Sequence, residues 1–161
     1  MKELLERISS YNIFNYLLPG VVFVSLSGFL TRYQFTPDDL LQAAFVYYFV
    51  GLIISRIGSI IIEPLLKAVR FLKFAPYEEF LSASKKDEKL EVLSETNNMY
   101  RTLCALALAL CLLKSYEVLS KIYPVITEWS MEAVVFGLVV LFLFSYRKQT
   151  LYITKRIENN K

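Results

Sequence analysis

The chain has 161 residues, of which 55% are apolar and 15% aromatic, and its 18 basic and 15 acidic residues leave a net charge of +3. An ordinary soluble domain contains about 45–50% apolar residues even when glycine is counted, so this composition argues against a soluble protein. Histidine is absent, which excludes Ser-His and Cys-His catalytic pairs, an imidazole base and His-containing metal sites. We therefore expect no enzyme activity, no cofactor and no metal.

Four apolar stretches reach or approach the roughly 18–20 residues that a helix needs to cross a bilayer. They are residues 13–30, residues 40–62, a third stretch that begins near Leu103 and includes Lys114, and a fourth at about 131–146. The third is the weakest, because its uncharged part, residues 103–113, also suits a buried or re-entrant segment. We predict an all-α, polytopic bundle of four transmembrane helices.

The first stretch also has features of a signal peptide. A small-x-small pattern near its end consists of Ser25, Ser27 and Gly28. The preceding residues carry as many acidic as basic side chains, and the pattern lies inside the apolar run, so we expect an uncleaved helix. An interfacial helix is predicted to lead into it, with an apolar face formed by Leu4, Leu5 and Ile8. Pro19 and Gly20 should bend the first helix, as a fixed kink rather than a moving hinge.

Basic residues are distributed unequally among the segments that flank the stretches. Fourteen of the 18 lie before the first stretch, between the second and third, or after the fourth. Because Lys and Arg are enriched in cytoplasmic loops, both termini and the middle segment are predicted to be cytoplasmic. A three-helix arrangement would place the basic tail on the wrong side, so the bias also favours the third crossing. The expected location is a cell inner membrane, with the lipid bilayer as the surrounding medium.

Small residues at intervals of four mark surfaces where helix backbones approach closely. The second stretch carries Gly51, Ser55 and Ser59, and the third carries Ala105 and Ala109. We interpret both stripes as helix-packing surfaces, with a pore-lining role as the alternative.

Arg56 is the only charged residue inside the second stretch, where an unpaired charge costs roughly 3 kcal/mol. Its side chain is expected either to snorkel to the inner headgroups or to face the bundle or a subunit interface. Glu63, seven residues later on about the same helical face, is the candidate counter-charge, from the same chain or from a neighbouring one. In an oligomer Arg56 would form a positive ring suited to anion passage, so it is a candidate gate.

Lys114 and Glu117 are three residues apart near the outer end of the third stretch, so they are expected to pair as helical neighbours. The aromatic residues around the same boundary are Tyr116, Tyr123 and Trp129. Amphipathic rings prefer this level of a membrane, so we interpret the group as an anchor, with an outer vestibule as the alternative.

The chain divides into three parts. Residues 1–62 hold the interfacial helix and the first two spans, residues 63–100 form a helical cytoplasmic loop, and residues 101–161 hold the last two spans and a basic tail. The loop opens with Pro64 and a basic, apolar run, residues 67–74, that is typical of an amphipathic helix on anionic lipid. The rest of the loop lacks Pro and Gly from residue 77 onward, which predicts helices, the last continuous with the third span.

The charges of the loop suggest what it binds. Seven acidic residues balance seven basic ones over residues 63–101, which argues against a nucleic-acid partner. Residues 64–100 are instead expected to bind a cytoplasmic protein or to support self-association into a homo-oligomer.

Three strings resemble those of small uncharacterised bacterial inner-membrane proteins: residues 11–20 (YNIFNYLLPG), 54–59 (ISRIGS) and 97–101 (NNMYR). In size and layout the whole chain is also similar to the small membrane subunits of anti-phage defence systems, such as that of Kiwa and the accessory membrane proteins of some CRISPR systems. This second resemblance implies an oligomeric membrane sensor or effector that stays silent until a cytoplasmic partner or an infection signal releases it. It assigns a role to no residue.

These observations leave three classes of function. The first is an oligomeric pore-forming or membrane-perturbing effector or sensor, controlled through the cytoplasmic segment and acting in bacterial anti-phage defence. The alternative is a non-conducting membrane anchor or scaffold that recruits a cytoplasmic protein. A membrane enzyme is least favoured, because the spans lack histidine and buried carboxylates, and four short spans leave little room for the repeated halves of a secondary transporter.

Overall fold

A computed structural model of the chain describes residues 13–159, and all regular structure in that part of the chain is helical. The predicted interfacial helix, with Leu4, Leu5 and Ile8, lies outside the described residues. In chain order the elements are η1 (Ile13–Leu17), α3 (Leu18–Leu30), α4 (Leu40–Ile57), η2 (Gly58–Ile62), α5 (Glu63–Ala68), α6 (Tyr77–Ser84), α7 (Lys89–Ile122), α8 (Val125–Glu128) and α9 (Ser130–Glu158).

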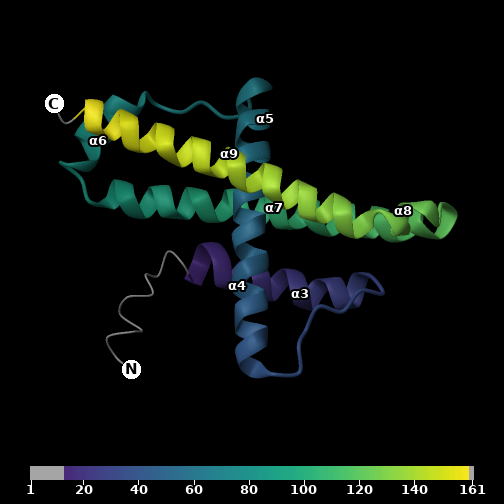
Figure 1. The fold of residues 1–161 in the computed structure, drawn as a ribbon. Helices are drawn as coiled ribbons and strands as arrows, with labels where there is room; N and C mark the ends of the chain where they lie inside the picture. Colours follow the sequence, from purple (N-terminus) through teal and green to yellow (C-terminus); the bar gives the residue numbers. More distant parts are fainter. Residues whose placement is uncertain (1–12, 160–161) are drawn as a thin grey trace.

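The segment α4–η2–α5 is the element on which the other long helices pack. In Figure 1 its axis runs across those of α3, α7 and α9, and α4 contacts all three. A small apolar core lies where α4 and η2 meet α7, and its buried members are Ile54, Ile62, Ala105, Leu106 and Leu110. The arrangement is therefore organised around a crossing helix.

Three helices are long and apolar enough to cross a membrane: Leu40–Ala68, Lys89–Ile122 and Ser130–Glu158. The apolar helix Asn15–Leu30 is shorter, and the prediction of four spans stays a prediction. The third stretch, the weakest in the sequence, qualifies because α7 continues without a break from the charged residues of the middle segment into the apolar ones. The predicted helices of the middle segment, including this continuity, are confirmed by α6 and α7.

Both π-helical turns precede a proline by two residues. η1 ends at Leu17 before Pro19, and η2 ends at Ile62 before Pro64. Proline has no N–H to offer the carbonyl four residues earlier, so the helix must widen or bend there. In η2 the N–H of Glu63 bonds the carbonyl of Gly58, five residues back. The irregularity predicted at Pro19 and Gly20 thus takes the form of a π turn that runs directly into the proline.

The amphipathic helix predicted for residues 67–74 is wrong, because α5 ends at Ala68. Its end is a Schellman motif, in which the N–H of Phe71 bonds the carbonyl of Leu66 at 2.9 Å and the N–H of Arg70 bonds that of Lys67 at 3.0 Å. Arg70 occupies the left-handed position with φ 60°. Glycine is usual at this position, because a side chain there costs about 1–2 kcal/mol. Since this sequence has arginine there instead, it lacks the glycine that would have predicted the end of the helix.

The stripe of small residues on α4 and η2 lies where other helices come closest. Gly51, Ser55 and Ser59 are all buried, and a Cβ built on Gly51 would overlap the carbonyl oxygen of Tyr16. A Cβ on Gly20 would likewise overlap the carbonyl oxygen of Tyr47. The two glycines therefore let η1–α3 and α4 touch backbone to backbone.

The second stripe, on α7, packs less completely. Ala105 is fully buried beside Gly58, whereas Ala109 is only partly buried. Gly58 is not part of either small-residue stripe, yet it packs closely on α7, because a Cβ on it would lie 3.2 Å from the carbonyl oxygen of Arg101.

The last long helix, α9, is largely unpacked. Only 6% of its apolar window is buried, against 28% for the windows of α4–α5 and α7. Its exposed apolar residues include Val135, Phe136, Val139, Leu143 and Phe144. Most of α9 is therefore available to lipid or to another protein.

Replacing Gly51 with alanine should destabilise the fold by about 1–3 kcal/mol, because the new methyl group has to push η1 away from α4. The thermal unfolding midpoint in detergent, followed by circular dichroism, measures this. Gly137→Ala is the matched control in α9, where nothing lies within 4 Å of the added atom and a small gain of up to about 1 kcal/mol is expected. Equal midpoints for the two variants would contradict the close crossing.

Candidate functional site

One buried carboxylate joins three helices near the end of the segment α4–η2–α5, where α7 and α9 pass across it (Figure 1). We call this the Glu63 cluster, and its residues are Ser59, Glu63, Lys67, Arg101 and Lys148. Glu63 and Lys67 are one helical turn apart on α5, Arg101 lies in the first half of α7, and Lys148 lies in the second half of α9. Residues that are far apart in sequence thus meet at the start of α5.

The carboxylate of Glu63 accepts from three cations. Its Oε1 lies 2.9 Å from Lys67 Nζ and 3.5 Å from Lys148 Nζ, and its Oε2 lies 2.7 Å from Arg101 Nη1. Lys148 Nζ also donates to the carbonyl and the hydroxyl oxygen of Ser59, at 2.8 and 2.9 Å. The Glu63 side chain is only 9% exposed, so protein cations replace the water that a carboxylate needs.

This geometry makes Glu63 an electrostatic clamp, by which we mean a carboxylate that holds several helices together through ion pairs. The pair with Lys67 lies within α5, and the pairs with Arg101 and Lys148 join α5 to α7 and α9. Burying a single carboxylate unpaired would cost several kcal/mol, whereas three charge-assisted hydrogen bonds offset that cost. The cluster also carries one negative and three positive charges, so it remains electropositive.

Arg56 is held by a different helix. Its Nη2 donates to the Tyr16 hydroxyl at 2.7 Å, and its guanidinium carbon lies 5.9 Å from the centre of the Tyr16 ring. Glu63, the counter-charge proposed from spacing, has its two oxygens directed at Lys67, Arg101 and Lys148 instead. Within this one chain Arg56 therefore faces the packed bundle, on the side of η1.

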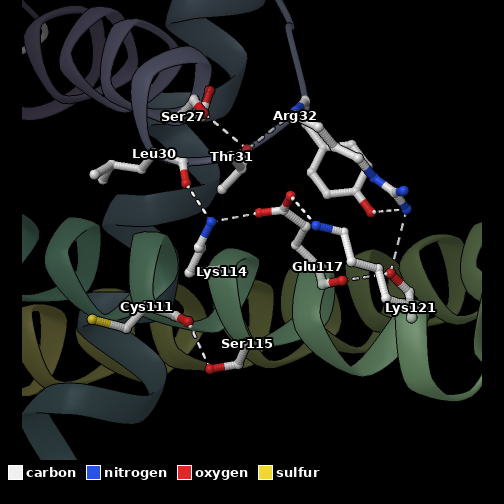
Figure 2. A network of polar contacts seen from close by, with 11 residues as sticks. Ser27, Leu30, Thr31, Arg32, Cys111, Lys114, Ser115, Glu117 and Lys121 are labelled. Carbon is white, nitrogen blue, oxygen red and sulfur yellow. Dashed lines mark hydrogen bonds and ion pairs between the residues drawn. The ribbon is translucent and has the colours of Figure 1, made fainter.

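A second cluster lies near the C-terminal end of α7, and Figure 2 shows it. Glu117 is 4% exposed, and its carboxylate bonds Lys114 at 2.8 Å and Lys121 at 3.1 Å. The pairing of Lys114 with Glu117 is the one that the spacing predicts. Lys114 Nζ also donates to the carbonyl of Leu30 at 2.8 Å, which fixes the end of α3 against α7.

The loop after α3 extends this second cluster. Arg32 Nη2 donates to the Tyr33 hydroxyl at 3.2 Å and to the Ser120 hydroxyl at 3.4 Å. The Arg32 guanidinium lowers the pKa of the Tyr33 phenol from its usual value, because its hydrogen bond and its charge favour the phenolate. The same hydrogen bond raises the pKa of Arg32. The uncharged stretch of α7 between Arg101 and Lys114 thus has a buried glutamate with basic partners at each of its ends.

The two clusters are suited to holding helices together and to attracting anions. Over the described residues, no group of three or more His, Cys, Asp or Glu side chains is placed to hold a metal ion. The chemistry that these residues offer is donation of hydrogen bonds from Lys and Arg.

Sequence reasoning found Glu63 but missed its true partners. Arg101 and Lys148 lie 38 and 85 residues away, and neither spacing carries a local signal. One local signal was available: Arg101 and Lys148 are both among the first charged residues at the edge of an apolar run. Tyr16 was missed for the same reason, since nothing local connects it to Arg56.

Comparison with known protein families, curated proteins and solved structures gives no match for this chain. The function therefore has to be argued from the residues alone.

Glu63→Gln should destabilise the protein strongly, because it leaves three cations without a counter-charge in a largely desolvated place. Removing one partner of a buried pair costs about 3–5 kcal/mol, and the partial exposure of Lys67 favours the lower end. The matched control is Glu78→Gln on the exposed face of α6, which should change stability by less than about 0.5 kcal/mol. The midpoints of thermal unfolding in detergent compare the two, and similar small shifts would show that the clamp contributes little.

Proposed function

We propose that this chain is a non-conducting membrane anchor or scaffold that recruits a cytoplasmic protein. The observation that carries this proposal is the pairing of the charges in its apolar helices. Glu63 bonds three cations, and Arg56 bonds Tyr16, all within one chain. An ion pathway needs polar groups that face a water-filled lumen, and groups already bonded to one another are poor candidates for that role.

The recruiting surface is assigned to the segment 64–100. No residue of α6 is fully buried, and its exposed side, with Glu78, Glu79 and Ser82, is available to a partner. At the start of α7, Val92 and Leu93 are 63% and 62% exposed among charged neighbours such as Glu91 and Glu95. Large apolar side chains in a charged, water-facing segment are typical of protein contact sites.

An oligomeric pore-forming or membrane-perturbing effector is the second candidate, and the exposure of α9 favours it. A helix whose apolar window is only 6% buried has a full face available for a second copy of the chain. In that case the assembly would act in anti-phage defence, as the resemblance in size and layout implies, and Arg56 would be released from Tyr16 on opening.

For either function we propose four spans in a cell inner membrane, with both termini and the segment 63–100 in the cytoplasm. The positive-inside rule supports this orientation, because the middle segment and the tail hold most of the basic residues. Fusions of alkaline phosphatase, which is active only outside the cytoplasm, test it. Fusion after residue 36 should be active, and fusion after residue 86 or residue 159 should be inactive. Activity at residue 159 would mean that one predicted crossing is absent.

Ion flux separates the two candidate functions. Liposomes that contain the purified full chain should leak ions no faster than protein-free liposomes if the chain is a scaffold. Flux that Arg56→Ala changes, and that the exposed control Lys85→Ala does not, would instead establish the pore.

Recruitment is tested by photo-crosslinking in cells that express the full chain. A photoreactive residue in place of Leu93 should give one discrete adduct with a different protein, and Val92→Ser should weaken that adduct. A ladder of multiples of the chain's own mass would support the oligomeric effector, and the absence of any protein adduct would contradict the scaffold.

A further inference from the structure

The Glu63 cluster carries more positive charge than its carboxylate can balance. Lys67 and Lys148 approach the same oxygen, Oε1, while Arg101 approaches the other. Like charges held this close repel one another, and the repulsion is weakly screened where water is scarce. A further anion at the cluster would relieve it.

Two of the three cations keep hydrogen-bond donors for such an anion. Lys148 directs its ammonium at two oxygens of Ser59 and at Glu63, which uses its three protons. Arg101 gives Glu63 one of its five N–H groups, and Lys67 gives it one of three. The Lys67 side chain is also 43% exposed, so a ligand can reach it from outside the cluster.

Arg70, three residues after Lys67, adds a third cation at the end of α5. Its N–H bonds the carbonyl of Lys67, and its side chain is exposed. It occupies the left-handed position that closes α5, where glycine would be relaxed and arginine is strained. A strained residue that persists suggests that its side chain serves a purpose beyond the turn itself.

The surroundings of the three cations indicate what kind of anion they meet. Val69, Phe71 and Phe74 are exposed in the segment that follows α5, and Leu65 is exposed on α5 itself. The ammonium of Lys67 lies 4.1 Å from the centre of the Phe74 ring. Basic groups next to exposed aromatic and aliphatic side chains, at the end of a candidate membrane helix, match the boundary between headgroups and acyl chains.

We propose that Lys67, Arg70 and Arg101 form a binding site for the phosphate of an anionic phospholipid headgroup, with Phe71 and Phe74 against its acyl chains. The site requires that the chain reside in a membrane, but it is independent of whether the protein acts as a scaffold or as an effector. A bound lipid would neutralise the surplus charge of the Glu63 cluster and hold the α5–α6 segment at the membrane surface.

The test is native mass spectrometry of the full chain in detergent, titrated with phosphatidylglycerol or with phosphatidylcholine. One phosphatidylglycerol should bind more tightly than phosphatidylcholine. The decisive variant is Arg70→Gly, because it removes the charge and relaxes the backbone at once. It should weaken phosphatidylglycerol binding about fivefold while the thermal midpoint stays equal or rises. Arg70→Lys, which keeps the charge, should retain most of the binding.

The control is Lys85→Gln, which removes one positive charge from an exposed position after α6 and should leave lipid binding unchanged. Equal binding of the two lipids would overturn the proposal, as would an unchanged affinity in Arg70→Gly. An equal loss in Lys85→Gln would show diffuse attraction rather than a site. If inorganic phosphate displaces the lipid and chloride of the same ionic strength does not, the site takes soluble phosphate and the lipid assignment fails.

Discussion

The cost of burying charge is the constraint from which the rest of this structure follows. Glu63 lies in a desolvated position, so the protein has to bring cations to it. Arg101 and Lys148 can reach it only if α7 and α9 cross the same end of α4–η2–α5, as they do in Figure 1. The glycine contact between α3 and α4 fixes the other half of the molecule, and there it is close packing that determines the geometry.

The glycine contacts and the ion pairs have different roles: the glycines allow close packing, and the ion pairs fix which helix surfaces meet. Apolar helices in a lipid environment gain little from hydrophobic burial, since lipid is as apolar as their side chains. Gly20 and Gly51 provide backbone contact, but by themselves they leave the rotation of the helices open. The ion pairs of Glu63 and Glu117 add fixed points on α7, at Arg101 and at Lys114. The long helix α9 shares only one of these points, through Lys148, which explains why it is the least buried.

The sequence predicted the local features well and the distant ones poorly, for physical reasons. Helical type, the packing role of Gly51 and the Lys114–Glu117 pair follow from periodicity and short spacing, and the structure contains them. The end of α5 was missed because Arg70 stands where a glycine would have signalled a stop. The partners of Glu63 and Arg56 were missed because a single sequence contains no record of which helices cross. Charge alone predicted where such residues belong, at the edges of the apolar runs, but not which of them meet.

The spacing of the two clusters along α7 explains why both are built from paired charges. The longest uncharged run of α7 lies between Arg101 and Lys114 and is roughly 20 Å long in a helix, whereas the hydrocarbon core of a bilayer is about 30 Å thick. In a membrane-spanning α7, the charged side chains at both ends of this run would start within the hydrocarbon and would have to snorkel outward or find partners. Lys114 and Lys121 both pair with the buried Glu117, while their own side chains stay 53% and 59% exposed. At the other end Arg101 is mostly buried and depends on Glu63. The clusters are thus what allows a helix with so short an apolar centre to be a candidate span.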